Sequence, residues 1–323
     1  MKSRIASLLK TTLALSFVFA ALGCSIFPKE PEIDHRNKLI LVTGASFEVG
    51  DLTKALDSII DVQSGNNKQN IVIFVHGRGG GRVKHPEKAI KQMLPFIESE
   101  YGTRVVLFNW KGSEKGGKLG FPEEEARAAS GDLFKVLTQL AEYKHKKSDQ
   151  LTGVRFALLT HSMGSLVVEE TVAKHFRDIN LNPGLLDVLV LSASASKSKG
   201  HSKWLDKAEL ANQVFVTLNS KDSPLGMVSV GRGRRLGKGL KKSETSVRAQ
   251  YIDVSNTGVN HRYFIAHTKN GGNNGQKGNP CISEFYKAAL NGTPVDLSNF
   301  QGIQEVRQER VFVMKTATGD KCR

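Results

Sequence analysis

Seven apolar runs along the chain have the length and composition of β-strands. They are rich in Val, Ile, Leu and Phe and contain few polar positions, which is typical of strands buried on both faces of a sheet. The predicted strands are 38–43, 71–75, 104–108, 154–159, 186–192, 213–218 and 249–254.

Segments with helical spacing lie between these runs. The predicted helices are 52–62, 86–100, 122–143, 164–177, 203–211 and 281–290. Alternation of strand and helix favours the α/β class, with a mostly parallel central sheet wrapped by helices. No internal repeat and no linker divides the sequence, so we expect a single domain over residues 38–323. The Gly/Asn-rich stretch 270–279 is predicted to be a loop.

The beginning of the chain has the layout of a bacterial export signal. A basic start precedes an apolar run over residues 11–22 and then a small residue. The run is shorter than the roughly 20 apolar residues that span a bilayer. A lipoprotein signal, which ends at a modified cysteine, has this layout, and the alternative is an ordinary secretory signal in which the cysteine is incidental. Both predict export.

The ending Ala-Leu-Gly-Cys at residues 21–24 resembles the cleavage box of bacterial lipoproteins. The resemblance implies a signal peptide over 1–23, a lipidated Cys24 and a tether over 24–37. Ser25 after the cysteine resembles lipoproteins that are sent to the outer membrane. We therefore expect a lipid-anchored protein of the bacterial envelope, in the outer membrane and facing the periplasm.

The charge of the chain is strongly positive, with 46 Lys+Arg against 31 Asp+Glu and a net charge of +15. The hydrophobic fraction of 39% is that of a globular protein. Such a charge first suggests nucleic acid or an anionic membrane as a partner. Three of the basic residues belong to the predicted signal, and seven lie with one acid in the loop 231–248. We therefore expect no nucleic-acid partner, and an anionic envelope component as a candidate partner of this loop.

Two cysteines, Cys281 and Cys322, lie outside the predicted signal and its lipidation site. Exported proteins enter an oxidising compartment, where disulfides persist. A disulfide between the two residues would fix the C-terminal tail, and two buried thiols are the alternative.

The segment Thr-His-Ser-Met-Gly at 160–164 joins a predicted buried strand to a predicted helix. Ser162 lies at the turn between them, where small neighbours permit close approach of backbone. The segment resembles the nucleophile elbow G-x-S-x-G of the α/β hydrolases, with Thr160 in the first position and Gly164 in the last. The N–H of Met163, at the helix start, is expected to point to a developing oxyanion.

A second motif, His76-Gly77-Arg78, follows the predicted strand 71–75. In the α/β hydrolases an HG-x motif follows the third strand, and the next residue supplies an N–H to the oxyanion hole. The resemblance gives that role to Arg78. Gly77 allows the backbone to approach the substrate without a Cβ atom. We expect His76 to be a structural, hydrogen-bonded histidine.

The order of the triad in this fold is serine, then acid, then histidine. The resemblance gives the acid to Asp222, just past the seventh strand, with Asp206 past the sixth strand as the runner-up. It gives the base to His261, on the loop after the eighth strand, with His267 as the alternative.

The pieces IVIFVHG, VVLFNW, THSMG and HRY occur in this order. They resemble one bacterial branch of the α/β hydrolases of largely unassigned function, over residues 70–290. The resemblance implies a serine hydrolase in which His261 takes the proton of Ser162 and Asp222 orients His261. The expected activity is cleavage of an ester through an acyl-enzyme, as in a carboxylesterase or an envelope-lipid hydrolase, without a cofactor. The sequence does not distinguish ester substrates from thioesters or amides.

The segment 193–212 lies where many lipases carry a large lid. It has about 20 residues, which favours a short lid region and an open site. The sequence does not decide the length of the acyl chain.

A dehydrogenase is the strongest competing enzyme class. Residues 41–51, LVTGASFEVGD, together with Ser130, Tyr143 and Lys147, resemble short-chain dehydrogenases. However, Glu48 replaces a glycine of the phosphate-binding turn, and its charge would oppose a pyrophosphate. Ser130 also lies in a helical pattern rather than at a strand end, so we set this interpretation aside.

A non-catalytic lipoprotein is the alternative from a different functional class. In that case the fold would serve as a scaffold, and the basic loop 231–248 would bind anionic lipid headgroups or another envelope polymer. A solvated, partly disordered loop is the simplest interpretation of the same residues. The histidines and cysteines lack the spacing of metal ligands, so no metal site is predicted.

Overall fold

The computed structural model describes residues 37–60, 69–78, 89–112, 121–175, 183–240, 244–265, 279–291, 294–308, 310–315 and 322. All of them belong to the unit His35–Arg323. The predicted signal peptide 1–23, the lipidation site Cys24 and the alternative base His267 lie outside the described residues.

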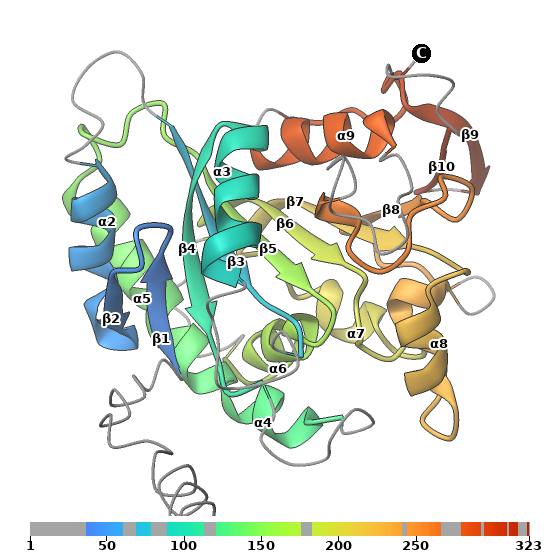
Figure 1. The fold of residues 1–323 in the computed structure, drawn as a ribbon, viewed down its shortest axis with the longest axis horizontal. Helices are drawn as coiled ribbons and strands as arrows, with labels where there is room; N and C mark the ends of the chain where they lie inside the picture. Colours follow the sequence, from blue (N-terminus) through green and yellow to red (C-terminus); the bar gives the residue numbers. More distant parts are fainter. Residues whose placement is uncertain are drawn as a thin grey trace, which may run out of the picture. The chain divides into compact units, whose positions relative to one another are not determined.

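One sheet of ten strands forms the centre of this unit, in the order β2-β1-β4-β3-β5-β6-β7-β8-β10-β9 (Figure 1). Its strands are β1 Lys38–Leu41, β2 Ser46–Glu48, β3 Asn70–Val75, β4 Thr103–Asn109, β5 Phe156–His161, β6 Leu186–Ser192, β7 Ala211–Leu218, β8 Ala249–Asp253, β9 Ile303–Gln308 and β10 Val311–Met314.

The strands from β4 to β10 along this order are parallel to one another. Strand β1 is antiparallel to both β2 and β4, and β9 is antiparallel to β10. The run β4-β3-β5-β6-β7-β8, with a sharp turn from β5 into the following helix, is the arrangement of the α/β-hydrolase fold. The predicted fold class is therefore confirmed.

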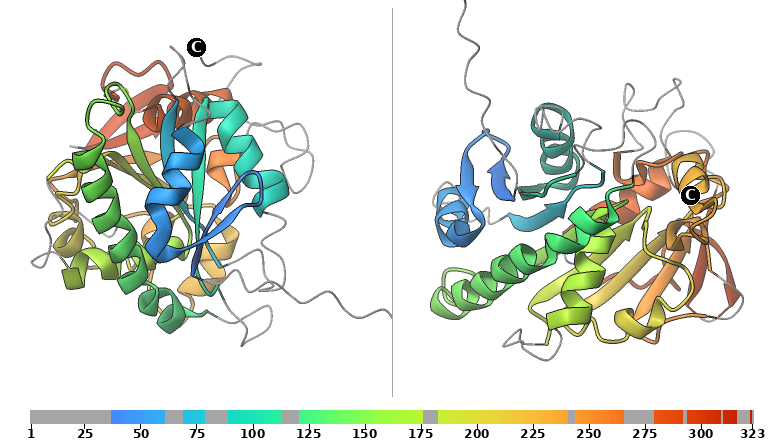
Figure 2. Two further views of the ribbon diagram at one scale, coloured as in Figure 1. Left: turned by 90° about the vertical axis from the view of Figure 1, so that its left-hand side faces the viewer. Right: turned by 90° about the horizontal axis from the view of Figure 1, so that it is seen from below.

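Helices cover both faces of the sheet (Figure 2). They are α2 Leu52–Ile60, α3 Leu94–Tyr101, α4 Glu123–Ala128, α5 Ser130–Lys146, α6 Gly164–His175, α7 Ser202–Leu205, α8 Ser223–Ser229 and α9 Pro280–Leu290. Helices α2, α4 and α6 pack with α5 as one group, and α3 packs with α9. A π-helical turn, Ala89–Met93, precedes α3.

The core explains why the apolar runs form strands. Every residue of β5 is buried, as are the last five of β3, because helices cover both faces of these central strands. Helix α5 instead buries one stripe, which includes Leu133, Val136, Leu137 and Leu140, at the spacing of a helical face. No helix among the described residues is long and apolar enough to cross a membrane.

The structure adds elements that the sequence did not predict. The prediction ended the sheet with the strand at 249–254, whereas β9 and β10 follow as a hairpin at the edge of the sheet. β9 reads IQEVRQ and is only partly apolar, whereas β10, VFVM, is an apolar run of four residues that the prediction missed. The predicted strand 38–43 ends at Leu41 as β1, and a turn and then β2 follow it. Helix α8 lies over residues for which the sequence predicted no element.

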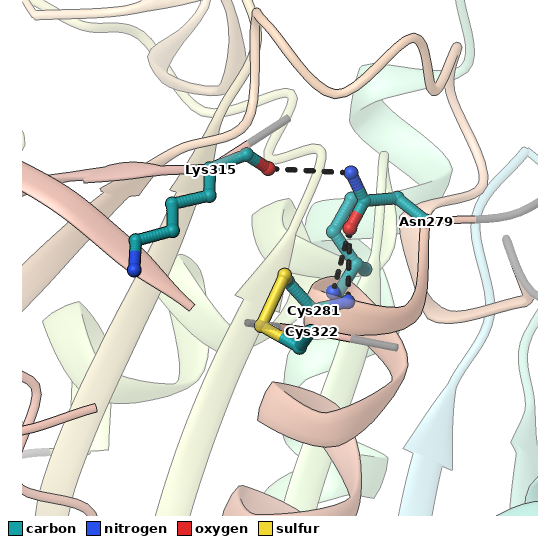
Figure 3. Close-up of a disulfide and its surroundings, with 5 residues drawn as sticks. Asn279, Cys281, Lys315 and Cys322 are labelled. Atoms are coloured by element: carbon teal, nitrogen blue, oxygen red, sulfur yellow. Dashed lines mark hydrogen bonds between the residues drawn. A yellow bond between two sulfur atoms is a disulfide. The ribbon is translucent and has the colours of Figure 1, made fainter. Parts of the chain in front are cut away.

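Cys281 and Cys322 are joined by a disulfide, with a Cα–Cα distance of 4.7 Å (Figure 3). Cys281 lies in the first turn of α9, where its N–H donates to the capping side chain of Asn279 at 2.9 Å. Asn279 Nδ2 donates to the carbonyl of Lys315 at 3.3 Å. The end of the chain is thus bonded to the beginning of α9, as the pairing of the two cysteines in the sequence predicts.

Candidate active site

Ser162 lies in the turn between β5 and α6 with a left-handed backbone, at φ 51°. This conformation is unfavourable for a residue with a side chain and persists only where the surroundings hold it. The Ser162 N–H donates to the carbonyl of Ser192 at 2.9 Å. Its carbonyl accepts from Ser165 Oγ at 2.7 Å and from the N–H of Ala195 at 3.1 Å. Both neighbouring segments therefore fix the strained turn.

Two glycines permit the close packing of this turn against the end of β3. A Cβ atom on Gly164 would lie 2.4 Å from the carbonyl oxygen of Val75 and 2.7 Å from that of His76. A Cβ atom on Gly77 would lie 3.0 Å from Cβ of Ser162. Backbone atoms form most of these contacts and cannot rotate away, so both positions require glycine.

Asp222 and His261 form the second half of the site. Nδ1 of His261 lies 2.8 Å from Oδ2 of Asp222, which is fully buried. A carboxylate only accepts, so Nδ1 carries the proton and Nε2 keeps a lone pair. The other carboxylate oxygen accepts from the N–H of Leu225 at 2.9 Å, because Asp222 also caps α8. The acid is held in one orientation from both sides.

Tyr263 is a functional residue that the sequence did not identify as one. Its hydroxyl donates to Oδ2 of Asp222 at 2.5 Å, beside the bond from His261. Burial raises the pKa of Tyr263 well above its usual range, so the phenol stays protonated and donates. The HRY motif contains this tyrosine, and the spacing from His261 was the one signal that pointed to it.

Asn219, at the end of β7, holds the loop that carries His261. Its side-chain nitrogen donates to the carbonyls of Val259 and Asn260, at 2.9 and 3.1 Å. Asn219 is fully buried, and its Oδ1 accepts from the N–H of Lys221. No motif pointed to this residue, because its role depends on the contact between two strand ends.

Ser162 and His261 open onto one cavity of about 400 Å³. This volume lies within the range of small-molecule sites. The predicted oxyanion-hole residues Arg78 and Met163 line the same cavity. Its other lining residues are Phe121, Pro224, Leu225, Met227, Val228, Val230 and Arg232.

His76 is held as a neutral, structural histidine. Nδ1 lies 2.5 Å from the carbonyl oxygen of Gly77, which only accepts, so Nδ1 carries the proton. Nε2 accepts from the N–H of Trp110 at 3.2 Å, and the two rings are stacked. Burial lowers the pKa of His76 to about 4. The ring therefore fixes the loop of the HG motif.

His161, next to the nucleophile, is a second buried neutral histidine. Burial, followed by the nearby His261, lowers the pKa of His161 well below its usual value. Nε2 lies 3.2 Å from the carbonyl of His261, which only accepts, so the imidazole donates there. His161 thereby ties β5 to the loop that carries His261.

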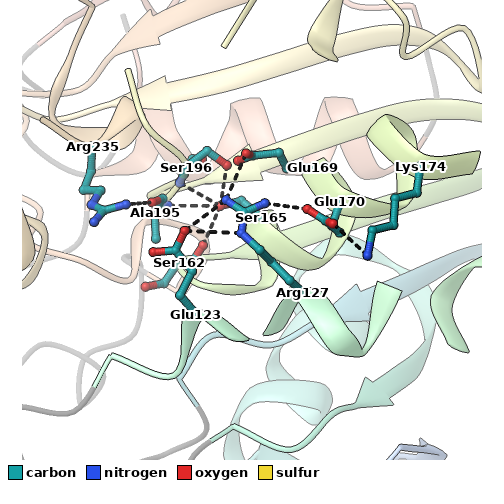
Figure 4. A network of polar contacts seen from close by, with 11 residues as sticks. Glu123, Arg127, Ser162, Ser165, Glu169, Glu170, Lys174, Ala195, Ser196 and Arg235 are labelled. Carbon is teal, nitrogen blue, oxygen red and sulfur yellow. Dashed lines mark hydrogen bonds and ion pairs between the residues drawn. The ribbon is translucent and has the colours of Figure 1, made fainter. Parts of the chain in front are cut away.

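The hydroxyl of Ser165, in the first turn of α6, links this helix to the segment after β6 (Figure 4). Ser165 is fully buried, and its Oγ accepts from the N–H groups of Ala195 and Ser196 at 3.0 and 3.3 Å while donating to Ser162. One side chain thus joins the nucleophile turn to the end of β6.

Helix α6 is also tied to α4 by ion pairs (Figure 4). Arg127 bonds to Glu123 at 3.0 Å, Glu169 at 3.2 Å and Glu170 at 2.7 Å. Glu170 further pairs with Lys174 at 2.9 Å. Since α6 carries the N–H groups beside Ser162, this network helps to fix the position of the site.

The basic loop is more structured than the sequence suggested. Within 231–248, the residues Arg235, Leu236 and Gly237 are buried. The N–H groups of Leu236 and Gly237 donate to the segment after β6, and Gly237 accepts from Asn219. The expectation of a solvated loop is therefore wrong for this part, although Arg232 and Arg234 are exposed.

The competing candidates lie away from the cavity. Asp206 accepts from Ser246 Oγ at 2.6 Å and so fixes the loop before β8. Tyr143 donates to Asp57 on α2 at 2.7 Å, and Ser130 begins α5. None of these three candidates is among the residues that line the cavity with Ser162.

No family model matches the chain, and no curated protein matches it. TT1662 from Thermus thermophilus is 13% identical with a TM-score of 0.39, over 70% of this chain and 90% of that chain. A hyperthermophilic esterase from the archaeon Pyrobaculum calidifontis is 15% identical with a TM-score of 0.39, over 70% and 76%. XC6422 from Xanthomonas campestris, described as an a/b serine hydrolase without lid, is 15% identical with a TM-score of 0.38, over 69% and 81%. The fold assignment rests on the strand order, and the site rests on its own geometry.

Within the described residues, no group of three or more His, Cys, Asp or Glu side chains could hold a metal ion. The chemistry that the site offers is that of its serine, histidine and carboxylate.

Proposed function

We propose that the protein is a serine hydrolase that cleaves a carboxylic ester through an acyl-enzyme. The observation that carries this proposal is the left-handed Ser162 in one cavity with His261, whose Nδ1 is bonded to the buried Asp222. A serine on a strained turn and an oriented histidine are the two components that nucleophilic acyl transfer needs.

In the first step, Nε2 of His261 takes the proton of the Ser162 hydroxyl while Oγ attacks the acyl carbonyl. The imidazolium that forms is stabilised by Asp222, whose charge is already oriented by Leu225 and Tyr263. His261 then gives its proton to the departing alcohol, and the acyl group remains on Ser162.

The tetrahedral oxyanion needs donors that are in place before the reaction. We assign this role to the N–H groups of Met163 and Arg78. Both residues line the cavity with Ser162, and Met163 directly precedes α6, whose N-terminus favours negative charge. Removing one such donor costs about 3–4 kcal/mol in activation free energy in other hydrolases. Water activated by His261 then releases the acid and restores Ser162.

The expected test is hydrolysis of short aryl esters by the purified domain and by its Ser162→Ala variant. Wild type should release p-nitrophenol from p-nitrophenyl butyrate, and the variant should lose turnover while keeping its unfolding midpoint in urea. Equal hydrolysis by both proteins would overturn the assignment of Ser162. A chain-length series of esters would then define the acyl preference.

The cellular place of the enzyme is a separate proposal from the sequence. The signal-like start and Cys24 support a lipid anchor in the bacterial envelope, so that the substrate is an ester reachable from the periplasm. A Cys24→Ser variant should no longer incorporate labelled palmitate and should leave the membrane fraction. Membrane retention of that variant without label would contradict the anchor.

A further inference from the structure

The cavity in front of Ser162 has an uneven distribution of charge. Two of its lining side chains, Arg78 and Arg232, are permanently positive, and no carboxylate stands among the lining residues that the structure describes. Asp222 is the nearest acid of the site, but it is fully buried behind His261 and satisfied by its donors. A ligand in the cavity therefore meets positive charge.

Arg232 lies at the wall of the cavity with its charge uncompensated. Its guanidinium carbon is 5.3 Å from the centre of the Phe121 ring, which also lines the cavity. The side chain is exposed and forms no ion pair with any carboxylate that the structure describes. A guanidinium held on an aromatic ring is oriented for bidentate binding of a carboxylate or a phosphate.

A second cation, Arg235, lies against the same ring and adds to this positive charge. The guanidinium carbon of Arg235 is 4.7 Å from the centre of Phe121, and Arg235 is fully buried. Its Nη1 donates to the carbonyl of Ala195, whereas Nε and Nη2 find no hydrogen-bond partner among the described residues. Because Arg232 and Arg235 lie against the same ring, an anion beside Arg232 would offset the repulsion between the two guanidinium groups. The carboxylates of Glu123 and Glu169, which are bonded to Arg127, also stabilise the charge of Arg235.

Several other lining residues of the cavity are apolar. Helix α8 and the residue that follows it contribute Leu225, Met227 and Val230 to the lining. Met227 and Val230 are 67% and 80% exposed, so an apolar chain that covers them would remove them from water. The cavity thus combines apolar lining residues with cationic ones.

On the proposed esterase function, we infer that the preferred substrate is an ester with an anionic group on an apolar arm. The arm lies against Met227 and Val230, and a carboxylate or phosphate at its end pairs with Arg232. Both groups offer the same chemistry, an anion that accepts two parallel N–H bonds. The reaction is the one given above, and the anion takes no part in it.

The test compares matched anionic and neutral esters. The first pair is the p-nitrophenyl ester of glutarate and that of its monomethyl ester, and the second is butyryl glycerol phosphate and monobutyrin. Wild type should prefer the anionic member of at least one pair by about tenfold in kcat/KM, the effect of one charge-assisted contact of about 1.4 kcal/mol. The pair that shows the preference identifies carboxylate or phosphate as the recognised group.

Arg232→Gln should reduce this preference about fivefold, mainly through KM, because the contact forms on binding. Arg234→Gln is the matched control, since Arg234 is exposed in the same loop, donates to the carbonyl of Lys238 at 2.9 Å and does not line the cavity. It should leave the preference unchanged. Equal preference in wild type for both members of both pairs, or equal effects of the two variants, would overturn the inference.

A binding measurement separates this inference from the proposed function. Ser162→Ala should bind free glutarate or glycerol phosphate by calorimetry, and the added Arg232→Gln change should weaken that binding about fivefold. Binding of this kind without ester hydrolysis by wild type would overturn the proposed function alone. Hydrolysis of neutral esters through Ser162 without any binding of the anions would overturn the anionic preference alone.

Discussion

Gly164 is the position where the smallest change should do the most damage. It begins α6, directly after the nucleophile turn, and its Cα faces the end of β3. In Gly164→Ala the new methyl group would lie 2.4 Å from the carbonyl oxygen of Val75. Carbon–oxygen contacts settle near 3.3 Å, so the start of α6 must retreat by about 0.9 Å.

This displacement has two expected effects. Overpacking of this kind lowers the free energy of unfolding by about 1–3 kcal/mol. The same movement shifts Ser162 relative to His261, and a misplacement of about 1 Å lowers the rate of an oriented reaction about 100-fold. Activity should therefore fall far more than stability.

Gly131→Ala is the matched control, because it adds the same methyl group near the start of another helix. Nothing lies within 4 Å of its Cβ position, so alanine should leave stability unchanged or raise it by about 0.5–1 kcal/mol. Urea denaturation and hydrolysis of p-nitrophenyl butyrate measure both effects. If Gly164→Ala behaves as Gly131→Ala does, the close approach of α6 to β3 is wrong.

Three further predictions concern stability and bonding. Tyr263→Phe removes a donor from the buried Asp222 and should lower the free energy of unfolding by about 1–3 kcal/mol; an unchanged urea midpoint would refute that bond. Burial holds the pKa of His76 at about 4, below about 6.5 in the unfolded chain, so its contribution is present at pH 7 and is lost as the pH falls. Between pH 7 and 4 the free energy of unfolding should therefore drop by about 3 kcal/mol more in wild type than in His76→Gln; parallel curves would count against it. Peptide mapping without reduction should join Cys281 to Cys322, whereas free peptides would contradict the disulfide.

The strands and the elbow were accessible from the sequence because their signals are local. A strand covered on both faces must be apolar throughout, and the tight turn at 160–164 needs a small residue after Met163. The sheet edge was less accessible, because β9 is only partly apolar and β10 has only four residues. β10 pairs with β8, which lies 60 residues earlier in the chain (Val311 with Tyr251).

The candidate site likewise contains residues that the sequence identifies and residues whose roles depend on contacts between distant segments. Asp222 and His261 could be selected because the fold fixes which strand ends carry the acid and the base, and their side chains are bonded to each other. Asn219 could not, because it acts through a contact that spans 40 residues of chain and belongs to no motif. Tyr263 belongs to the HRY motif, but its bond to Asp222 spans 41 residues and has no local signal. The burial of Arg235 was also hidden, since a run of basic residues normally indicates a solvated surface.

The most direct test of the central claim is the site of a covalent label. The purified protein should react with a fluorophosphonate, and mass spectrometry should find one adduct per chain on Ser162. His261→Ala should slow this labelling by orders of magnitude, because the serine is weakly nucleophilic without its base. Labelling of another residue, or labelling of Ser162 at the same rate in His261→Ala, would contradict the proposed triad.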